Sequence, residues 1–325
     1  MTSIKRAVVT GAEGFIGRRL VEFLLSRGWQ VTAADRVHKS EGSGSSERLT
    51  VVRFDLTDPV QVSESLRLAR PTHVFHLAAE SLPEASWIDP VRVFQSNVLG
   101  SLYLFEAVRH LPKPPLIVSA CSSAEYGPTQ RSRVPVKENQ PLRPVNPYGL
   151  SKVCLEFLST EYAKRHRIPA ITLRLFNTTG PAKIGDAPSD FVRQLVQIER
   201  KGQPRVIEVG NLGSQRAFLH VDDVVRAFYL AAARAKIGEV YNICAGQVIS
   251  IGDLLRLVIR LSGVKARARV AKRLVRSVDE PIIWGDSVKF RKATGWRPVI
   301  SLEQTLAEMI EYWRRHDEEE LTPGT

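Results

Sequence analysis

Short apolar runs alternate with amphipathic segments along the first half of the chain. Residues 7–10, 30–34 and 51–55 are compact, mostly apolar runs of the kind that buried strands contain. The segments 18–26 and 60–68 follow the first and the third of these runs and carry apolar residues at the spacing of a helix. This alternation predicts a parallel sheet with helices on both faces, which is the doubly wound α/β class.

The alternation continues to about residue 176 and then weakens. It predicts further strands over 72–79, 115–120 and 170–176, and a long helix over 90–109. At 325 residues the chain exceeds the usual size of one domain. We expect a first domain over 1–176 and a smaller α/β domain over 177–325, some segments of which return to the first.

A glycine-rich turn follows the first predicted strand. Gly11, Gly14 and Gly17 are three residues apart, with Phe15 and Ile16 between the last two. Glycine lets the backbone of such a strand-turn-helix approach a pyrophosphate, whose charge is stabilised by the N–H groups and the positive dipole end of the helix. We therefore predict a Rossmann-type sheet that binds a dinucleotide at this turn.

Asp35 and Arg36 end the second predicted strand, eighteen residues after Gly17. A carboxylate at about this distance typically holds the ribose diol of a dinucleotide and repels a 2′-phosphate, whereas an Arg beside it accepts that phosphate. We expect NAD as the cofactor, and Arg36 leaves NADP open as the alternative. The second domain, 177–325, is then expected to bind the substrate.

Tyr148 and Lys152 are four residues apart and share one face of the helix that we predict around them. A cation beside a phenol stabilises the phenolate and lowers the pKa of the tyrosine, which makes it a usable acid or base. Ser122 and Ser123 follow the strand at 115–120, at the sheet edge where such folds bind ligands. We predict that Ser122, Tyr148 and Lys152 form a redox site acting on a carbonyl or hydroxyl group.

Composition restricts the kinds of partner that we expect and the cellular compartment. The chain has 46 basic and 34 acidic residues, a formal net charge of +12, but its dense basic run at 265–276 contains no aromatic residue to stack on bases. We expect no nucleic-acid partner. The absence of a long apolar run or a signal peptide predicts a cytoplasmic protein without a membrane partner. Cys121, Cys154 and Cys244 lack metal-ligand spacing, so we expect buried thiols and no metal site.

Further motifs give the chain a resemblance to the extended short-chain dehydrogenases/reductases over nearly its whole length. They lie at 10–17, 55–56, 76–79, 96–98, 122–127, 148–152, 174–177 and 295–298. The likeness is to the nucleotide-sugar branch, first to GDP-4-keto-6-deoxy-D-mannose reductases and then to GDP-mannose 4,6-dehydratases. The segment 209–216 is similar to a signature of these GDP-sugar enzymes. The resemblance implies NAD(P)H-dependent reduction at C4 of a GDP-4-keto-6-deoxyhexose of the GDP-6-deoxy-D-mannose (rhamnose) type.

The resemblance also implies roles for individual residues. Ser122 and Tyr148 would hold the C4 oxygen of the sugar, and Lys152 would bind the nicotinamide ribose. Cofactor contacts implied in addition to those above are Asp55, Leu56, Leu77, Ala78, Ala79 and Asn97. Substrate contacts implied in the same way are Ser81, Ser123, Asn177, Asn211, Arg216, Arg276 and Asp279.

Three positions depart from the family pattern. Ala124 stands where dehydratases carry a Glu for proton transfer, and the adjacent Glu125 on an extended segment is expected to point the other way. Ala217 replaces an Asp that usually follows the phosphate-binding Arg216. Asp35 is commoner in enzymes that keep NAD bound. A 4,6-dehydratase, a C4 epimerase and a non-catalytic, cofactor-binding regulator therefore stay open as alternatives.

Family members commonly dimerise through the helices that correspond to 90–109 and 148–165, so the resemblance implies a homodimer. The first of these helices carries apolar residues at helical spacing, namely Val91, Phe94, Val98, Leu102 and Phe105. Such a stripe fits a subunit interface, and it equally fits packing against the sheet.

Overall fold

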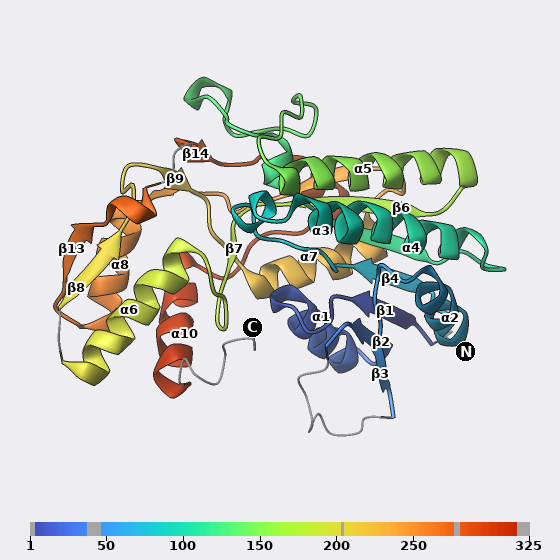
Figure 1. Ribbon diagram of the computed structural model, residues 1–325, viewed down its shortest axis with the longest axis horizontal. Helices are drawn as coiled ribbons and strands as arrows, with labels where there is room; N and C mark the ends of the chain where they lie inside the picture. The colour runs from blue at the N-terminus through green and yellow to red at the C-terminus, as the bar shows by residue number, and fades with distance from the viewer. Residues whose placement is uncertain (1–3, 38–46, 203–204, 276–279, 317–325) are drawn as a thin grey trace.

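A computed structural model describes residues 4–37, 47–202, 205–275 and 280–316. Seven parallel strands form the main sheet in the order β11-β6-β5-β4-β1-β2-β3 (Figure 1). Their bounds are β1 Arg6–Thr10, β2 Gln30–Asp35, β3 Leu49–Arg53, β4 His73–His76, β5 Leu116–Ser122, β6 Ala170–Leu175 and β11 Val240–Ile243. Strand order reverses between β1 and β4, which leaves a crevice at their carboxyl ends where open α/β sheets bind ligands.

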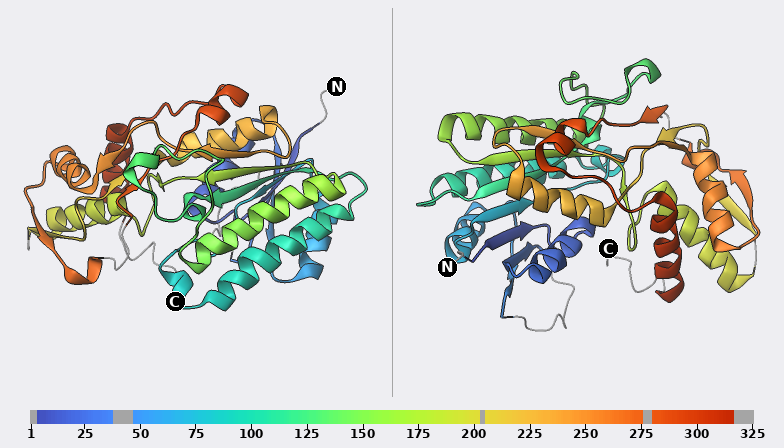
Figure 2. Two further views of the ribbon diagram at one scale, coloured as in Figure 1. Left: turned by 90° about the horizontal axis from the view of Figure 1, so that it is seen from above. Right: turned by 180° about the vertical axis from the view of Figure 1, so that it is seen from behind.

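Helices cover both faces of this sheet (Figure 2), as the sequence pattern predicted. The first layer is α1 Phe15–Ser26, α7 Val221–Arg234 and α9 Val288–Thr294. The second layer is α2 Pro59–Ala69, α4 Gly100–Arg109 and α5 Pro147–His166. The central strands are buried along nearly their whole length, which is why they read as continuous apolar runs rather than as alternating ones.

A second lobe has its own apolar core around Trp313 and lies beside the sheet (Figures 1 and 2). It contains α6 Ala187–Lys201, α8 Ile251–Ser262 and α10 Leu302–Arg315, with β8 Val206–Val209 paired to β13 Arg267–Val270. Short strands join the lobes, namely β7 Thr178–Thr179, β9 Gln215–Arg216, β10 Leu219–His220, β12 Ile249–Ser250 and β14 Ile282–Ile283. Because α7, β11 and α9 pack with the main sheet, the portion 177–325 contributes to both lobes.

The predicted helix at 90–109 is continuous but contains a π-helical turn. It consists of α3 Pro90–Phe94, the turn η2 Gln95–Leu99, and α4. Its apolar stripe divides between two environments, since Phe105 is buried against the sheet while Val91 remains 64% exposed. Within the described residues, no helix has the length and apolar character that a membrane crossing requires.

Candidate active site

A cavity of about 1860 Å³ lies at the carboxyl ends of the sheet strands and extends to the second lobe. Its walls include every described residue that we predicted for catalysis, cofactor or substrate, with the exception of Asn97. Arg276 and Asp279 lie outside the described residues. The predicted strand at 72–79 ends earlier, at His76, because Leu77 to Ala79 leave the sheet and line this cavity.

The glycine turn forms the first wall of the cavity. Gly11 has a φ of +70°, and a Cβ there would lie 2.8 Å from the backbone of Ala78. Gly14 is the N-cap of α1 and has no side chain to cap it, and Phe15 to Gly17 at the start of the helix line the cavity. This arrangement fits the pyrophosphate of a dinucleotide.

Asp35 and Arg36 lie where the adenosine end of that cofactor is expected. The Asp35 carboxylate accepts hydrogen bonds from the main-chain N–H of Glu13 at 2.9 Å and of Arg36 at 2.7 Å. The Arg36 guanidinium is paired with Glu80, 2.9 Å away, and Glu80 also pairs with Arg92. Asp35 is thus held in place by backbone donors, while Arg36 has a carboxylate partner of its own.

Two elements, α5 and β5, position the predicted catalytic residues. Asn146 caps α5 by accepting the N–H of Gly149 at 2.7 Å, which places Tyr148 in the first turn of the helix and Lys152 in the next. Ser122 is the last residue of β5, and its hydroxyl is hydrogen-bonded with the phenol of Tyr148. The Lys152 ammonium donates to the main-chain oxygen of Ala120 at 2.9 Å and lies 5.9 Å from the centre of the Tyr148 ring.

The protonation of Tyr148 differs from our expectation. We predicted that Lys152 lowers the pKa of this phenol, and for the structure that prediction is wrong. Burial raises the pKa of Tyr148 to about 12, and the hydrogen bond with Ser122 opposes the effect only in part. Burial also lowers the pKa of Lys152. At neutral pH Tyr148 therefore keeps its proton and is placed as a proton donor.

Asn97 lies behind the cavity wall and acts through its neighbours. Its amide accepts the N–H of Glu80 at 2.8 Å and donates to the hydroxyl of Ser151 at 2.9 Å, which in turn donates to the main-chain oxygen of Tyr148. The main-chain oxygen of Asn97 accepts from Ser101. The π-helical turn places Asn97 between α5 and the segment after β4, so it joins both sides of the site.

A buried histidine continues this network towards the glycine turn. His76 is hydrogen-bonded to the hydroxyls of Thr10 and Ser101, each at 2.9 Å. Burial lowers the pKa of His76 to about 3, so the ring is neutral and bridges the two hydroxyls without carrying charge. Thr10, next to the glycine turn, is thereby linked through His76, Ser101 and Asn97 to Ser151 on α5.

The segment after Ser122 separates two neighbouring side chains. Ala124 lines the cavity, whereas Glu125 is fully buried and accepts the main-chain N–H of Ser122 at 2.8 Å. Glu125 does point away from the cavity, as we expected, but the segment is a turn and not the extended stretch on which that expectation rested. The turn η3 (Ser123–Glu125) produces this arrangement, because its Glu125 carboxyl folds back onto Ser122 as a capping box.

The far wall of the cavity comes from the second lobe and the segments that join it to the sheet. Asn177, Asn211 and Arg216 line the cavity on this side, whereas Ser81 and Ser123 line it from the segments that follow β4 and β5. Where the family pattern has an Asp, Ala217 is fully buried, and the Arg216 guanidinium is oriented instead by the main-chain oxygens of Gln215 and Glu280, at 2.9 and 2.7 Å. Main-chain oxygens thus orient Arg216 without a carboxylate at position 217.

Three basic residues of the far wall were missed by the sequence analysis. Lys183, Arg193 and Arg273 line the cavity, and the ammonium of Lys183 lies 5.2 Å from the ring of Phe15 at the start of α1. Arg273 belongs to the basic run at 265–276, from which the sequence analysis named only Arg276 as a substrate contact. No motif marks these three residues, because only the tertiary contact between the lobes brings them to the cavity.

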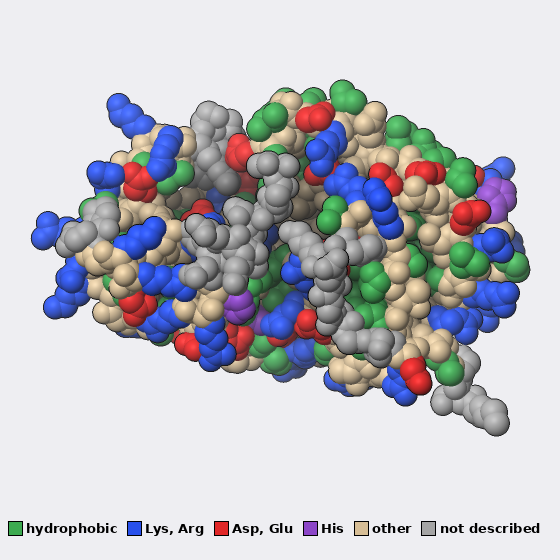
Figure 3. All heavy atoms as spheres, turned by 60° about the horizontal axis from the view of Figure 1, so that its bottom comes forward, with side chains coloured by type: hydrophobic (Ala, Val, Ile, Leu, Met, Phe, Trp, Pro, Cys, Tyr) green, Lys and Arg blue, Asp and Glu red, His purple; other side chains and the backbone are tan. Residues whose placement is uncertain are grey.

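The outer surface carries basic and acidic side chains side by side. On the face shown in Figure 3, Lys and Arg side chains are spread over both lobes and are interspersed with Asp and Glu. In the second lobe, Arg269 and Arg273 both form ion pairs with Glu208, which lines the cavity together with Arg273.

Comparison with known proteins gives a consistent result. The family model described as GDP-mannose 4,6 dehydratase matches residues 8–309. GDP-6-deoxy-D-mannose reductase of Pseudomonas aeruginosa is 27% identical, over 97% of this chain and 99% of its own. The structure of RMD from P. aeruginosa complexed with NADPH has a TM-score of 0.83 at 26% identity, covering 96% and 99% of the two chains. UDP-glucose 4-epimerase of Thermus thermophilus complexed with NAD has a TM-score of 0.84 at 28% identity, covering 95% and 99%.

Proposed function

Because the chain belongs to the NAD-dependent epimerase/dehydratase family of extended short-chain dehydrogenases/reductases, whose members modify nucleotide sugars, we propose that it reduces the C4 keto group of a GDP-linked 4-keto-6-deoxyhexose. The cofactor is NADH or NADPH, since similar structures hold NADPH or NAD and the residues at the glycine turn fit either. The product is a GDP-6-deoxyhexose of the GDP-6-deoxy-D-mannose type.

The observation that carries this proposal is the pair Ala124 and Glu125. A dehydratase needs a carboxylate at the sugar to move the C5 proton and protonate the leaving hydroxyl. Here the side chain that lines the cavity is a methyl group, and the adjacent carboxyl is buried behind Ser122. Reduction at C4 needs no such group, because it requires only a hydride and one proton.

The chain's own residues supply the proton. A reduced nicotinamide, when bound, supplies the hydride that adds to the C4 carbon. Ser122 and Tyr148 hold the carbonyl oxygen, and the protonated phenol of Tyr148 transfers its proton to that oxygen as negative charge develops on it. The positive charge of Lys152, close to the Tyr148 ring, stabilises the phenolate that remains.

The second lobe supports a diphosphate on the substrate. Arg216 is only 8% exposed and faces a cavity that also contains Lys183, Arg193 and Arg273. Guanidinium and ammonium groups are the side chains that a pyrophosphate requires. Assignment of the base as guanine rests on the segment 209–216, which resembles the signature of GDP-sugar enzymes and includes the cavity residue Asn211.

The test is to incubate the purified protein with GDP-4-keto-6-deoxy-D-mannose and either NADH or NADPH, and separately with GDP-mannose, and to identify products by mass spectrometry. We expect the keto sugar to gain two hydrogens while one equivalent of reduced cofactor is consumed, and GDP-mannose to be unchanged. Loss of water from GDP-mannose would assign a dehydratase instead and contradict our interpretation of Ala124.

A C4 epimerase is the second candidate, and Asp35 favours it. Its carboxylate is held by two main-chain N–H groups at the ribose position, an arrangement suited to retaining NAD. Such an enzyme would purify with bound NAD and interconvert a nucleotide hexose and its C4 epimer through several turnovers without added reductant. A strict requirement for added NADH or NADPH would exclude it.

We also propose that the protein is a homodimer. On α5, Leu150 and Phe157 are 45% and 59% exposed, and Val91 of the adjacent α3 is 64% exposed. Leu150 and Phe157 are seven residues apart and so share one helix face. Light scattering should give twice the chain mass of 36.3 kDa. A Phe157→Glu variant should have a mass closer to that of a single chain. A native protein with the mass of a single chain would refute the dimer.

A further inference from the structure

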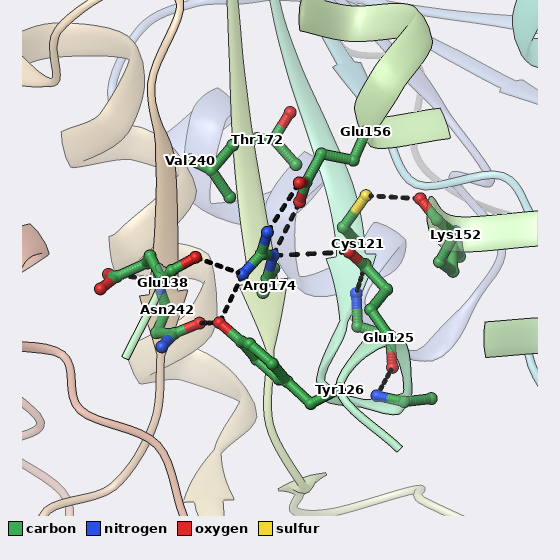
Figure 4. Close-up of polar contacts among 12 residues, drawn as sticks. Cys121, Glu125, Tyr126, Glu138, Lys152, Glu156, Thr172, Arg174, Val240 and Asn242 are labelled. Carbon is green, nitrogen blue, oxygen red and sulfur yellow. Dashed lines mark hydrogen bonds and ion pairs between the residues drawn. The ribbon is translucent and has the colours of Figure 1, made fainter. Parts of the chain in front are cut away.

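A cluster of buried polar side chains lies directly behind the catalytic wall (Figure 4). Cys121 and Glu125 come from the end of β5 and the turn after it, Glu156 from α5, and Arg174 from β6. All four side chains are buried. The Sγ atom of Cys121 and a carboxylate oxygen from each of Glu125 and Glu156 lie within 4.8 Å of one another. The cluster therefore brings two carboxyl groups together around one guanidinium.

The charges in this cluster do not balance if both carboxyl groups are ionised. Nε and Nη2 of Arg174 each donate to Glu156, at 2.7 and 2.6 Å. Its Nη1 donates to the hydroxyl of Tyr126 and to the main-chain oxygen of Glu138. The single Nε hydrogen is thus used by Glu156, although Nε is also 3.4 Å from Glu125 Oε2. Arg174 consequently gives Glu156 two hydrogen bonds but Glu125 only a longer ion pair.

The hydrogen bonds of Glu125 point to the same imbalance. Its Oε1 accepts the main-chain N–H of Ser122, but no described residue donates a hydrogen bond to its Oε2. A buried carboxylate oxygen without a donor is costly. If Oε2 carries a proton instead, it becomes a donor, and Glu156 lies within reach as its acceptor. Burial and the neighbouring Glu156 raise the pKa of Glu125 to about 8, in agreement with this geometry.

We propose that Glu125 is a positioning residue which, as a neutral carboxylic acid bonded to both Ser122 and Glu156, holds the Ser122 end of the active site and keeps a second negative charge out of the wall behind Tyr148. Glu125 touches neither the cavity nor a reacting atom. It acts through the backbone of Ser122 and through its field on the catalytic pair. The inference about turnover rests on the proposed ketoreductase function, whereas the inference about the proton does not.

Loss of this proton has a defined electrical effect. The titratable and charged groups around Glu125 are Cys121 on β5, Tyr126 next to it, Tyr148, Lys152 and Glu156 on α5, and Arg174 on β6. A negative charge on Glu125 raises the pKa of Tyr148 and so makes the phenol a weaker proton donor. It also disfavours the negative oxygen that develops beside Ser122. Turnover should therefore fall as Glu125 ionises.

Infrared spectroscopy of the purified protein, without substrate, tests the proton directly. We expect the native protein at neutral pH to show the C=O stretch of a buried carboxylic acid, and this band to disappear as the pH is raised through about 8. The band should be absent from Glu125→Gln. It should persist in Glu311→Gln, a matched substitution on the exposed face of α10. A native spectrum without a band that depends on Glu125 would overturn the proposal.

The pH profile of kcat tests the positioning role. Gln keeps an acceptor for the Ser122 N–H and cannot ionise, so Glu125→Gln should retain native kcat at neutral pH and lose the alkaline decline. Glu125→Ala removes the acceptor and should lower kcat by about tenfold, while reduced-cofactor binding, followed by fluorescence, is unchanged. An equal loss of kcat in both variants, or an unaltered alkaline decline in Glu125→Gln, would refute the positioning role.

If the keto sugar is not turned over at all but the infrared band behaves as expected, the proposed function fails and the assignment of the proton stands.

Discussion

The two walls of the cavity are built by different means. The wall on the sheet side is made largely of backbone, namely the glycine turn after β1, the start of α1 and the segment that leaves β4 at Leu77. The opposite wall is made largely of side chains such as Arg216, Lys183 and Arg193, which come from short strands, a loop and a helix of the second lobe. A backbone wall suits a cofactor that many enzymes share, and a side-chain wall suits a substrate that differs between them.

The proposed catalytic residues lie between the two walls, and removing the proposed proton donor should have the largest effect. Tyr148→Phe keeps the ring and its packing but deletes the hydroxyl that we propose as the proton donor to the C4 oxygen. We expect turnover to fall roughly a thousandfold, because a positioned general acid typically contributes that much. Steady-state assays with the keto sugar measure this loss, and fluorescence titration with reduced cofactor should show unaltered binding. Full activity in the variant would remove Tyr148 from the mechanism.

The backbone wall should break at a single glycine. Gly11→Ala places a Cβ against the backbone of Ala78 at a residue whose φ is +70°. We expect the dissociation constant of the cofactor to rise about tenfold or more and the melting temperature to fall. Calorimetric titration and thermal unfolding report the two effects. As a matched control, Gly238→Ala changes a glycine of similar φ with nothing within 4 Å of its added Cβ, so it should affect only the melting temperature.

The side-chain wall should respond selectively to the loss of one charge. Arg216→Gln preserves much of the length of the side chain but removes the cation that we assign to the diphosphate. We expect KM for the nucleotide sugar to rise about tenfold or more, kcat to change little, and cofactor binding to stay the same, since a hydrogen bond to a charged group is worth about 2 kcal/mol. Weaker cofactor binding with unchanged KM for the sugar would show that Arg216 has been assigned to the wrong wall.

The contact between the two walls should give the smallest effect. The ammonium of Lys183 projects from the loop between β7 and α6 to within 5.2 Å of the Phe15 ring at the glycine turn. Lys183→Met retains an unbranched side chain without its charge, and we expect only a few-fold rise in KM or in the dissociation constant, as is usual for a partly exposed cation. Which of the two parameters changes will show which ligand Lys183 contacts.

The catalytic residues show how far the sequence alone can be taken. The four-residue spacing of Tyr148 and Lys152 predicted a shared helix face, and the structure confirms it. Their electrostatics were not predictable in the same way. Whether a phenol has a raised or a lowered pKa depends on how deeply it is buried and on which atom the neighbouring ammonium contacts, and Lys152 donates to Ala120 rather than to Tyr148.

Local patterns therefore determined the parts of this protein that follow from short-range geometry. They include the parallel sheet with its two helical layers, the glycine turn, and Asp35 at the end of β2. These features depend on residue spacing and backbone conformation, which a few consecutive residues specify.

Tertiary structure decided what depends on distant segments. It turned Asn97 away from the cavity and into a bridge between Glu80 and Ser151, brought Lys183 to the glycine turn, and assembled Glu125, Glu156 and Arg174 from three elements. Burial, charge balance and hydrogen-bond partners are properties of the packed chain, because they are set by residues that are neighbours in space and far apart in sequence.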